Sequence, residues 1–129
     1  MSELVVFDTN VFVSYLLPSK KMSAVKLVVN KIGDETAILV FSDAIMAEYE
    51  DVLNRAKFCF PHDEVRALLD LVRRNGRCVI PIATSALFVD ESDKCFYDAA
   101  LTAGAHWLIT GNKRRLHKAN AVFRLNSSL

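Results

Sequence analysis

Short apolar runs alternate with longer segments of helical periodicity along the chain, and this alternation constrains the fold more than any other feature. The spacing predicts strands at Leu4–Phe7, Thr36–Phe41, Arg77–Ile82, His106–Thr110 and Ala121–Leu125. It predicts helices at Asn10–Leu17, Met22–Ile32, Ser42 or Asp43 to about Arg55, Pro61 to about Arg74 and Asp90–Gly104, with a helical turn at Asn112–His117. The helix from Pro61 has one apolar stripe, which contains Val65, Leu68, Leu69 and Val72. Strands that alternate with helices form a mostly parallel sheet with both faces covered, so we expect an α/β fold.

The length and composition fit one globular domain over residues 1–129. A domain commonly has about 100–200 residues, and this chain has 129. Hydrophobic residues make up 52% and charged residues 24%, which are globular proportions. The longest apolar runs are too short to cross a bilayer. The first residues meet an acid at Glu3 without a basic segment, which does not match a signal peptide. We expect a cytoplasmic protein with no membrane partner.

The cysteines and the net charge exclude two further classes. Cys59, Cys78 and Cys95 are odd in number and contain no Cys-x-x-Cys pair, which argues against a disulfide framework or a zinc site. We interpret them as buried thiols in a reducing compartment. The net charge of +1 gives no overall attraction to nucleic acid, so any such function requires local segregation of charge.

The acids that follow strands are the candidates for chemistry, because ligands of parallel sheets bind beyond the carboxyl ends of the strands. Asp8 directly follows the first predicted strand. Asp is also a good helix N-cap, and a short helix follows, so capping alone is the alternative interpretation.

Helical geometry separates the acids of the helix after Ser42. At about 100° per residue, one stripe of this helix is apolar. The stripe contains Ile45, Tyr49, Val52, Leu53 and Ala56. Glu50 and Asp51 fall opposite the stripe, which indicates a solvated face, whereas Glu48 lies on its edge. A carboxylate near the packed side is costly without a partner. The alternative for Glu48 is a surface ion pair with Arg55 or a nearby lysine.

The helix after Asp90 repeats this pattern. Its apolar stripe contains Phe96, Tyr97, Ala100, Leu101 and Ala103. Asp93 lies at the centre of the stripe in the first turn, and Asp98 falls on the far side. Acids in a first turn are favoured by the helix dipole, so Asp90 and Asp93 could serve only as cap and first-turn residues.

Together these positions direct one carboxylate from each of three elements to the same end of the sheet. Carboxylates held close repel one another, and at least one pKa would rise unless a cation joined them. A set of oxygen ligands without His or Cys suits Mg²⁺ or Mn²⁺ rather than Zn²⁺. Such a metal activates water and neutralises charge on a phosphodiester. The residues therefore indicate a metal-dependent phosphoryl-transfer site.

Three segments of the chain resemble the PIN domain, and most closely the VapC-like ribonuclease toxins of toxin–antitoxin pairs. They are Val-Val-Phe-Asp-Thr-Asn-Val-Phe-Val-Ser at 5–14, Phe-Ser-Asp-Ala-Ile-Met-Ala-Glu-Tyr-Glu-Asp-Val-Leu at 41–53 and Gly-Ala-His-Trp-Leu-Ile-Thr-Gly-Asn-Lys at 104–113. The resemblance implies a three-layer α/β/α sandwich with a central, mostly parallel sheet. It also implies an acidic pocket for Mg²⁺ or Mn²⁺ and endonucleolytic cleavage of RNA.

The family's acids match this chain at three positions. Asp8, Glu48 and Asp93 match the first, second and third acids. In a one-metal site, Asp8 and Asp93 would hold the ion, and Glu48 would orient or deprotonate the attacking water. The resemblance also assigns pocket-shaping polar roles to Asn10, Ser42 and Thr110.

The chain departs from the family pattern at the fourth acid. Related members often have Thr-Gly-Asp where this chain has Thr110-Gly111-Asn112. Asn112 can offer the metal a neutral oxygen, directly or through water, but one negative charge is missing. We therefore expect one well-bound metal, a weaker or absent second metal, and reduced activity.

A cationic stretch follows Asn112. It contains Lys113, Arg114, Arg115 and Lys118, with Arg124 further along the chain. At the rim of the pocket it would bind RNA phosphates with a salt-sensitive affinity, or meet an acidic segment of an antitoxin. The alternative is an ordinary solvated turn.

An apolar stretch near the first helix contains Phe12, Tyr15, Leu16 and Leu17. Core packing explains this stretch. It would also support the homodimer that the family commonly forms.

Two competing functions remain. Phe-Asp-Thr-Asn resembles the start of a haloacid-dehalogenase-type phosphatase with Asp8 as nucleophile, but that chemistry requires an Asp where this chain has Asn10. The other is a catalytically weak or inactive PIN-fold module that binds RNA or an antitoxin. A toxin, an orphan nuclease and a processing enzyme look alike at this level.

Overall fold

The structure is a computed structural model that describes residues 3–17, 24–34, 36–82, 91–105, 107–110 and 121–124. Its strands are β1 (Glu3–Phe7), β2 (Ala37–Phe41), β3 (Arg77–Cys78), β4 (Trp107–Thr110) and β5 (Ala121–Arg124). Its helices are α1 (Thr9–Leu16), α2 (Ala24–Gly33), α3 (Asp43–Leu53), α4 (His62–Asn75) and α5 (Glu91–Ala103), with a short 3₁₀ turn at Ala56–Phe58.

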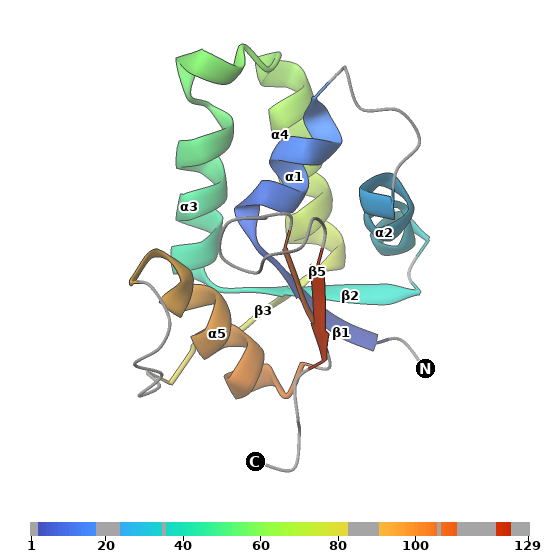
Figure 1. The fold of residues 1–129 in the computed structure, drawn as a ribbon, viewed down its shortest axis with the longest axis vertical. Coiled ribbons are helices and arrows are strands. Elements are labelled where there is room, and N and C mark those ends of the chain that lie inside the picture. The colour runs from blue at the N-terminus through green and yellow to red at the C-terminus, as the bar shows by residue number, and fades with distance from the viewer. Residues whose placement is uncertain are drawn as a thin grey trace.

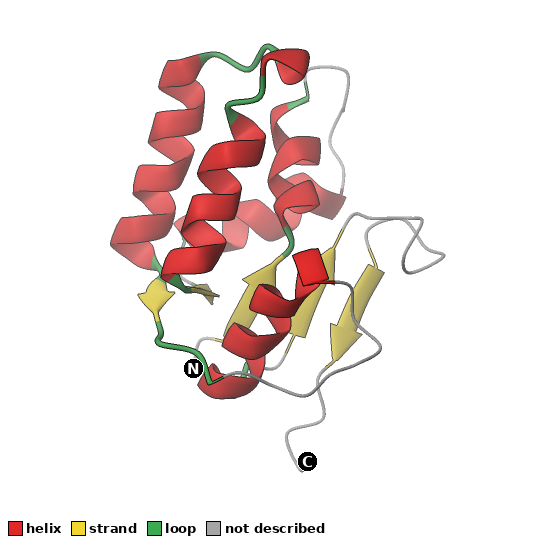
Figure 2. Ribbon diagram, turned by 90° about the vertical axis from the view of Figure 1, so that its left-hand side faces the viewer, coloured by secondary structure: helices red, strands yellow, loops and turns green. Residues whose placement is uncertain are grey.

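The strands form one sheet in the order β3-β2-β1-β4-β5, with β1 at its centre. The pairs β1–β2, β1–β4 and β2–β3 are parallel, and β4–β5 is antiparallel. The predicted mostly parallel sheet is therefore confirmed, and the strands stand out in yellow in Figure 2. Because parallel strands cannot be joined by tight turns, each connection between them passes through a helical crossover.

Helices cover both sides of this sheet. Helix α5 contacts β1, β2 and β4, whereas α2 and α4 contact β2 and α1 contacts β1 and β4. Figure 1 shows β2 edge-on, with α5 on one side of it and α1, α2 and α4 on the other. The predicted three-layer α/β/α arrangement is confirmed. Helix α3 stands beyond the end of β2 and contacts α1, α4 and α5, so it joins the two helical layers.

The core lies where the central strands meet the helices. The last three residues of β1 and of β2 are all buried, which explains why both strands consist of continuous apolar residues. The predicted apolar stripe of α4 is also buried and consists of Val65, Leu68, Leu69 and Val72. Helix α5 ends at Gly104, whose φ of 66° suits a glycine, and the Ala105 N–H bonds the Ala100 carbonyl at 2.9 Å.

The third strand is shorter than predicted. It was expected to reach Ile82 but ends at Cys78, because Pro81 has no N–H to donate and the next residues leave the sheet. Ile80 and Ile82 are 91% and 74% exposed.

Two other expectations on packing are wrong, and one lies outside the described residues. Cys59 and Cys78 are exposed and Cys95 is half-buried, so these free thiols are not the buried ones expected. Leu101, assigned to the apolar stripe of α5, is 49% exposed, while the Asp98 side chain is only 13% exposed beside Lys94. This helix is therefore rotated relative to the predicted stripe. The predicted helical turn at Asn112–His117 falls outside the described residues.

No helix within the described residues has both the length and the apolar character needed to cross a membrane.

Gly76 provides a test of the packing between α4 and the sheet. A Cβ at this position would lie 2.6 Å from the Val72 carbonyl oxygen and 2.7 Å from the Leu39 carbonyl oxygen. Because both neighbours are backbone atoms, Gly76→Ala should lower the free energy of unfolding by about 1–3 kcal/mol in urea titrations. Gly33→Ala is the matched control, since its Cβ would meet nothing within 4 Å. A similar loss in both variants would contradict the proposed packing.

Candidate functional site

The carboxyl ends of three neighbouring strands lie at one level. Phe7 in β1 pairs with Ile109 in β4, so the next position along this register aligns Asp8 with Thr110. Val5 pairs with Leu39 in β2, and continuing this register by three residues aligns Asp8 with Ser42. The sheet thus brings these three predicted site positions to the same edge.

Asp8 is buried at the exit of β1, with 9% of its surface exposed. Its backbone N–H donates to the Ile109 carbonyl at 2.9 Å, and its Oδ1 accepts a bond from the Asn10 N–H at 3.3 Å. The second bond makes Asp8 the N-cap of α1, as the capping interpretation expected. One oxygen of this buried carboxylate, Oδ1, therefore caps the helix that follows the central strand.

The first residues after β2 begin the helix that carries Glu48. Ser42 is 1% exposed, and its Oγ accepts a bond from the Ile45 N–H at 3.2 Å, so it caps α3. Glu48 is half-buried, as its place on the edge of the apolar stripe predicted. The alternative ion pair between Glu48 and Arg55 is not observed, since Arg55 pairs with Asp51 at 2.9 Å.

Tyr49, the residue after Glu48, is fully buried against the end of β1. Its hydroxyl donates to the Phe7 carbonyl at 2.6 Å. Its ring packs edge-on against Phe12 at 5.0 Å and lies 6.2 Å from the ring of Phe96. Burial raises the pKa of Tyr49 well above 10.0, and the charge of Asp8 and the nearby Cys95 raise it further. The hydroxyl is therefore a neutral donor at physiological pH.

The donors at this edge fit a hard divalent cation. Asp8 offers a buried carboxylate, and Glu48 makes no hydrogen bond or ion pair with the other described residues. Thr9, only 4% exposed, has a buried Oγ1 without a hydrogen-bond partner in the described part of the chain. A buried hydroxyl and two carboxylates are oxygen donors of the kind that Mg²⁺ and Mn²⁺ prefer.

The remaining predicted site residues fall partly or wholly outside the described residues. Asp93 lies in the first turn of α5, one turn before the buried Phe96, but its side chain is not described. Thr110 is the last residue of β4, and its side chain is likewise not described. Asn112 and the basic Lys113, Arg114, Arg115 and Lys118 lie outside the described residues. Among the side chains that the structure describes, no group of three His, Cys, Asp or Glu could hold a metal.

Sequence reasoning did not single out Thr9 or Tyr49. Tyr49 had been assigned to the apolar stripe of its helix, which its buried ring confirms. The partner of its hydroxyl lies 42 residues away, so the helical pattern could not indicate it. Thr9 gave no sequence signal beyond its place next to Asp8.

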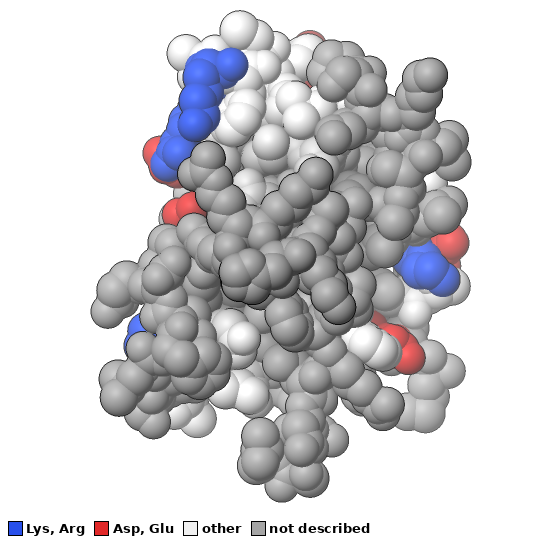
Figure 3. All heavy atoms as spheres, in the orientation of Figure 1, with Lys and Arg blue, Asp and Glu red and all other residues white. Residues whose placement is uncertain are grey.

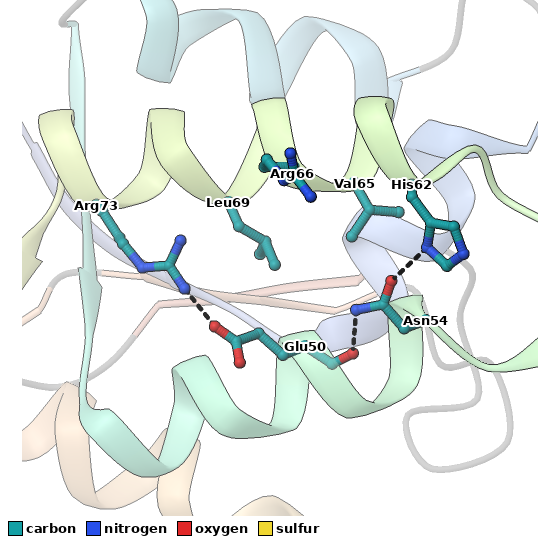
Figure 4. A pocket seen from close by; sticks show the side chains of 7 residues that line it. All are labelled: Glu50, Asn54, His62, Val65, Arg66, Leu69 and Arg73. Atoms are coloured by element: carbon teal, nitrogen blue, oxygen red, sulfur yellow. Dashed lines mark hydrogen bonds and ion pairs between the residues drawn. The ribbon is translucent and has the colours of Figure 1, made fainter.

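A pocket lies between α3 and α4, on the face of α3 that was predicted to be solvated. It has a volume of about 290 Å³ and is lined by Glu50, Asn54, His62, Val65, Arg66, Leu69 and Arg73. Figure 4 shows Glu50 paired with Arg73 at one end and Asn54 bonded to His62 at the other, at 3.3 Å for the second pair. Both ion-paired side chains are about half exposed, so the pair links α3 to α4 at the solvated surface and contributes little to stability.

Charges of opposite sign lie side by side on the surface of the described residues. On the face shown in Figure 3, blue and red side chains of the described residues stand at the margins of the molecule and partly next to one another. Such pairs give little net field for steering a polyanion.

The raised pKa of Tyr49 predicts how stability depends on alkaline pH. The native pKa lies above the unfolded value of about 10.0. The contribution of this group is therefore complete below pH 10, and it is lost as the pH rises from 10 through the native pKa. Tyr49→Phe should reduce the fall in the free energy of unfolding above pH 10 by up to about 1.4 kcal/mol per pH unit. Urea titrations between pH 9 and pH 11 measure this slope, and equal slopes in both proteins would contradict the assignment.

Comparison with known proteins gives one match. A family model described as PIN domain matches residues 4–114, which is most of the chain. No curated protein and no solved structure gives a significant match. The matched region contains the strand exits at Asp8 and Ser42, the helix that carries Glu48, and Asp93. By this match, and in agreement with the observed sheet and layers, the chain belongs to the PIN domain family.

Proposed function

We propose that the protein is a metal-dependent endoribonuclease that hydrolyses RNA phosphodiesters. PIN domains are typically metal-dependent nucleases, so membership of the family indicates nuclease activity in general. The observation that carries the finer proposal is the buried carboxylate of Asp8, which stands where three strands end, next to Thr9, whose hydroxyl has no hydrogen-bond partner among the described residues. The bond from Tyr49 to Phe7 ties the helix that carries the half-buried Glu48 to this edge. Burial of a hydroxyl such as Thr9 Oγ1, which finds no hydrogen-bond partner among the described residues, is unfavourable unless a ligand compensates for the lost hydration.

The site residues take separate roles in this proposal. Asp8 and Asp93 hold Mg²⁺ or Mn²⁺, with Asn112 contributing a neutral oxygen. When bound, the ion lowers the pKa of water and neutralises negative charge on the phosphate. Glu48 orients the attacking water and accepts its proton while a new bond forms between the water oxygen and phosphorus. The bond from phosphorus to the leaving oxygen breaks, and that oxygen takes a proton from solvent.

Polar and basic residues complete the proposed site. Asn10, Ser42 and Thr110 shape the pocket, and the caps that Asp8 and Ser42 make are consistent with fixed helix starts at its rim. The basic residues Lys113, Arg114, Arg115 and Lys118 bind RNA phosphates, which makes affinity fall with increasing salt.

We further propose that this single domain, covering residues 1–129, is the toxin of a toxin–antitoxin pair. It would act in the cytoplasm as a homodimer and be held inactive by an antitoxin protein. The support is the resemblance of segments 5–14, 41–53 and 104–113 to VapC-like toxins.

The second candidate is a catalytically weak or inactive PIN module that binds RNA or an antitoxin. The observation in its favour is Asn112, which stands in place of the fourth acid and removes one negative charge from the pocket.

Removing the charge of Asp8 should abolish metal binding. Mn²⁺ is expected to raise the melting temperature of the wild-type protein, because a ligand that binds only the native state stabilises it. Asp8→Asn should eliminate this rise and RNA cleavage while keeping the N-cap, since Asn caps as well as Asp. Thermal melts with and without Mn²⁺ test the loss of metal binding. Assays with single-stranded and structured RNAs test the loss of cleavage. Metal binding by an enzyme that leaves every RNA intact would favour the inactive module.

Substitution of the two glutamates of α3, Glu48 and Glu50, should have very different effects on the rate of RNA cleavage. Glu48→Gln removes the proposed base and should lower the rate of RNA cleavage about 10²–10⁴-fold. It should leave the stability of the metal-free protein unchanged or slightly higher, because it removes repulsion between carboxylates. Glu50→Gln is the matched control on the other face of the helix, where it loses only an exposed pair with Arg73. Equal losses of activity in the two variants would refute the assignment of these faces.

A further inference from the structure

One peptide group, the one that joins Phe7 to Asp8, is held on both sides at the end of the central strand. The N–H of Asp8 donates to the Ile109 carbonyl of β4 at 2.9 Å. In a trans peptide the carbonyl points the opposite way, toward the side of β2. The paired residues of β1 and β2 end at Val5 and Leu39, so no β2 residue takes this carbonyl in the ladder. The Tyr49 hydroxyl takes it instead, at 2.6 Å.

This bond connects the end of β1, which Asp8 follows, with α3, which carries Glu48. Its acceptor, Phe7, directly precedes Asp8, and its donor, Tyr49, directly follows Glu48. Both Asp8 and Glu48 are therefore one residue away from the same hydrogen bond. A change of position between β1 and α3 would have to break this bond and leave a buried hydroxyl and carbonyl unsatisfied, which is costly.

The ring of Tyr49 fixes where its hydroxyl stands. Tyr49 has no exposed surface, and its ring lies 5.0 Å from that of Phe12 in α1 and 6.2 Å from that of Phe96 in α5. Phe12 lies one turn after Asp8, and Phe96 lies one turn after Asp93. Tyr49 of α3 thus packs against α1 and α5, the other two helices with a proposed site acid at their start, and it cannot shift without disturbing this packing.

We propose that Tyr49 is a positioning residue of the acidic site, whose hydroxyl holds the Phe7–Asp8 peptide and thereby sets Asp8 relative to Glu48. The inference rests on the proposed metal-dependent function. It adds a residue that acts through the backbone rather than by touching metal or RNA. Partners that orient metal ligands commonly change metal affinity or activity about 10–100-fold when they are lost.

The test is Tyr49→Phe, which removes the hydroxyl and keeps the buried ring. Isothermal titration of the metal-free protein with Mn²⁺ should show affinity about 10–100-fold weaker than in the wild type. RNA cleavage should show a lower kcat with an unchanged KM, since the RNA-binding residues are untouched. An unchanged Mn²⁺ affinity in a folded Tyr49→Phe protein would overturn the proposal.

Two controls separate positioning from general stability. Tyr15→Phe makes the same chemical change on α1, at a half-buried hydroxyl that bonds to no other described residue, and should leave Mn²⁺ affinity unchanged. Val72→Ala removes buried core volume on α4 and should lower the melting temperature while leaving Mn²⁺ affinity unchanged. If Val72→Ala weakens Mn²⁺ binding as much as Tyr49→Phe does at a similar loss of melting temperature, the effect is one of stability and the proposal fails.

A second variant keeps the test decisive if Tyr49→Phe does not fold. Phe12→Leu retains the hydroxyl but removes the ring against which Tyr49 packs at 5.0 Å, so it should also weaken Mn²⁺ binding. Unchanged affinity in Phe12→Leu would then overturn the proposal. A wild-type protein that binds no Mn²⁺ would instead refute the proposed function itself, which distinguishes that failure from a failure of the role of Tyr49.

Discussion

Burial of β1 on both faces is the constraint on which the rest of the structure depends. A central parallel strand must pair on two sides and be covered on two faces, and its last three residues are accordingly buried. Each crossover returns the chain to the amino end of the sheet, so that the next parallel strand runs in the same direction and ends at the same edge. The polar residues that follow the strands therefore arrive at a common edge, although Asp8, Ser42 and Thr110 are far apart in the chain.

The exit of the central strand combines structural and chemical demands on one residue. Asp8 caps the first turn of α1 and contributes its backbone N–H to the sheet, so a capping side chain would be needed at this position even in a protein without a metal. What capping does not require is a charged group in so buried a place, since Ser caps α3 at the equivalent position after β2. The comparison of Asp8 with Ser42 within one molecule thus supports a role for the carboxylate beyond capping.

The sequence predicted those features that follow from periodicity. Val65, Leu68, Leu69 and Val72 were placed correctly because a helix with one apolar stripe has only one way to face the sheet. The edge position of Glu48 followed from the same geometry. In α5 the periodicity is less decisive, because small alanines can be buried on either side of a stripe, and the exposed Leu101 does not lie on the predicted buried face. The bond from Tyr49 to Phe7 depends on tertiary packing, which no local pattern contains.

The short edge strand β3 has a consequence for the behaviour of the protein at high concentration. An open strand edge offers unpaired N–H and carbonyl groups on which another chain could add a strand. Here β3 has only two residues, and the proline four positions after its start interrupts the row of donors just where Ile80 and Ile82 expose apolar surface. An interrupted edge of this kind disfavours intermolecular strand addition. The apolar side chains of Ile80 and Ile82 are therefore exposed without an adjacent row of backbone donors and acceptors that would promote aggregation.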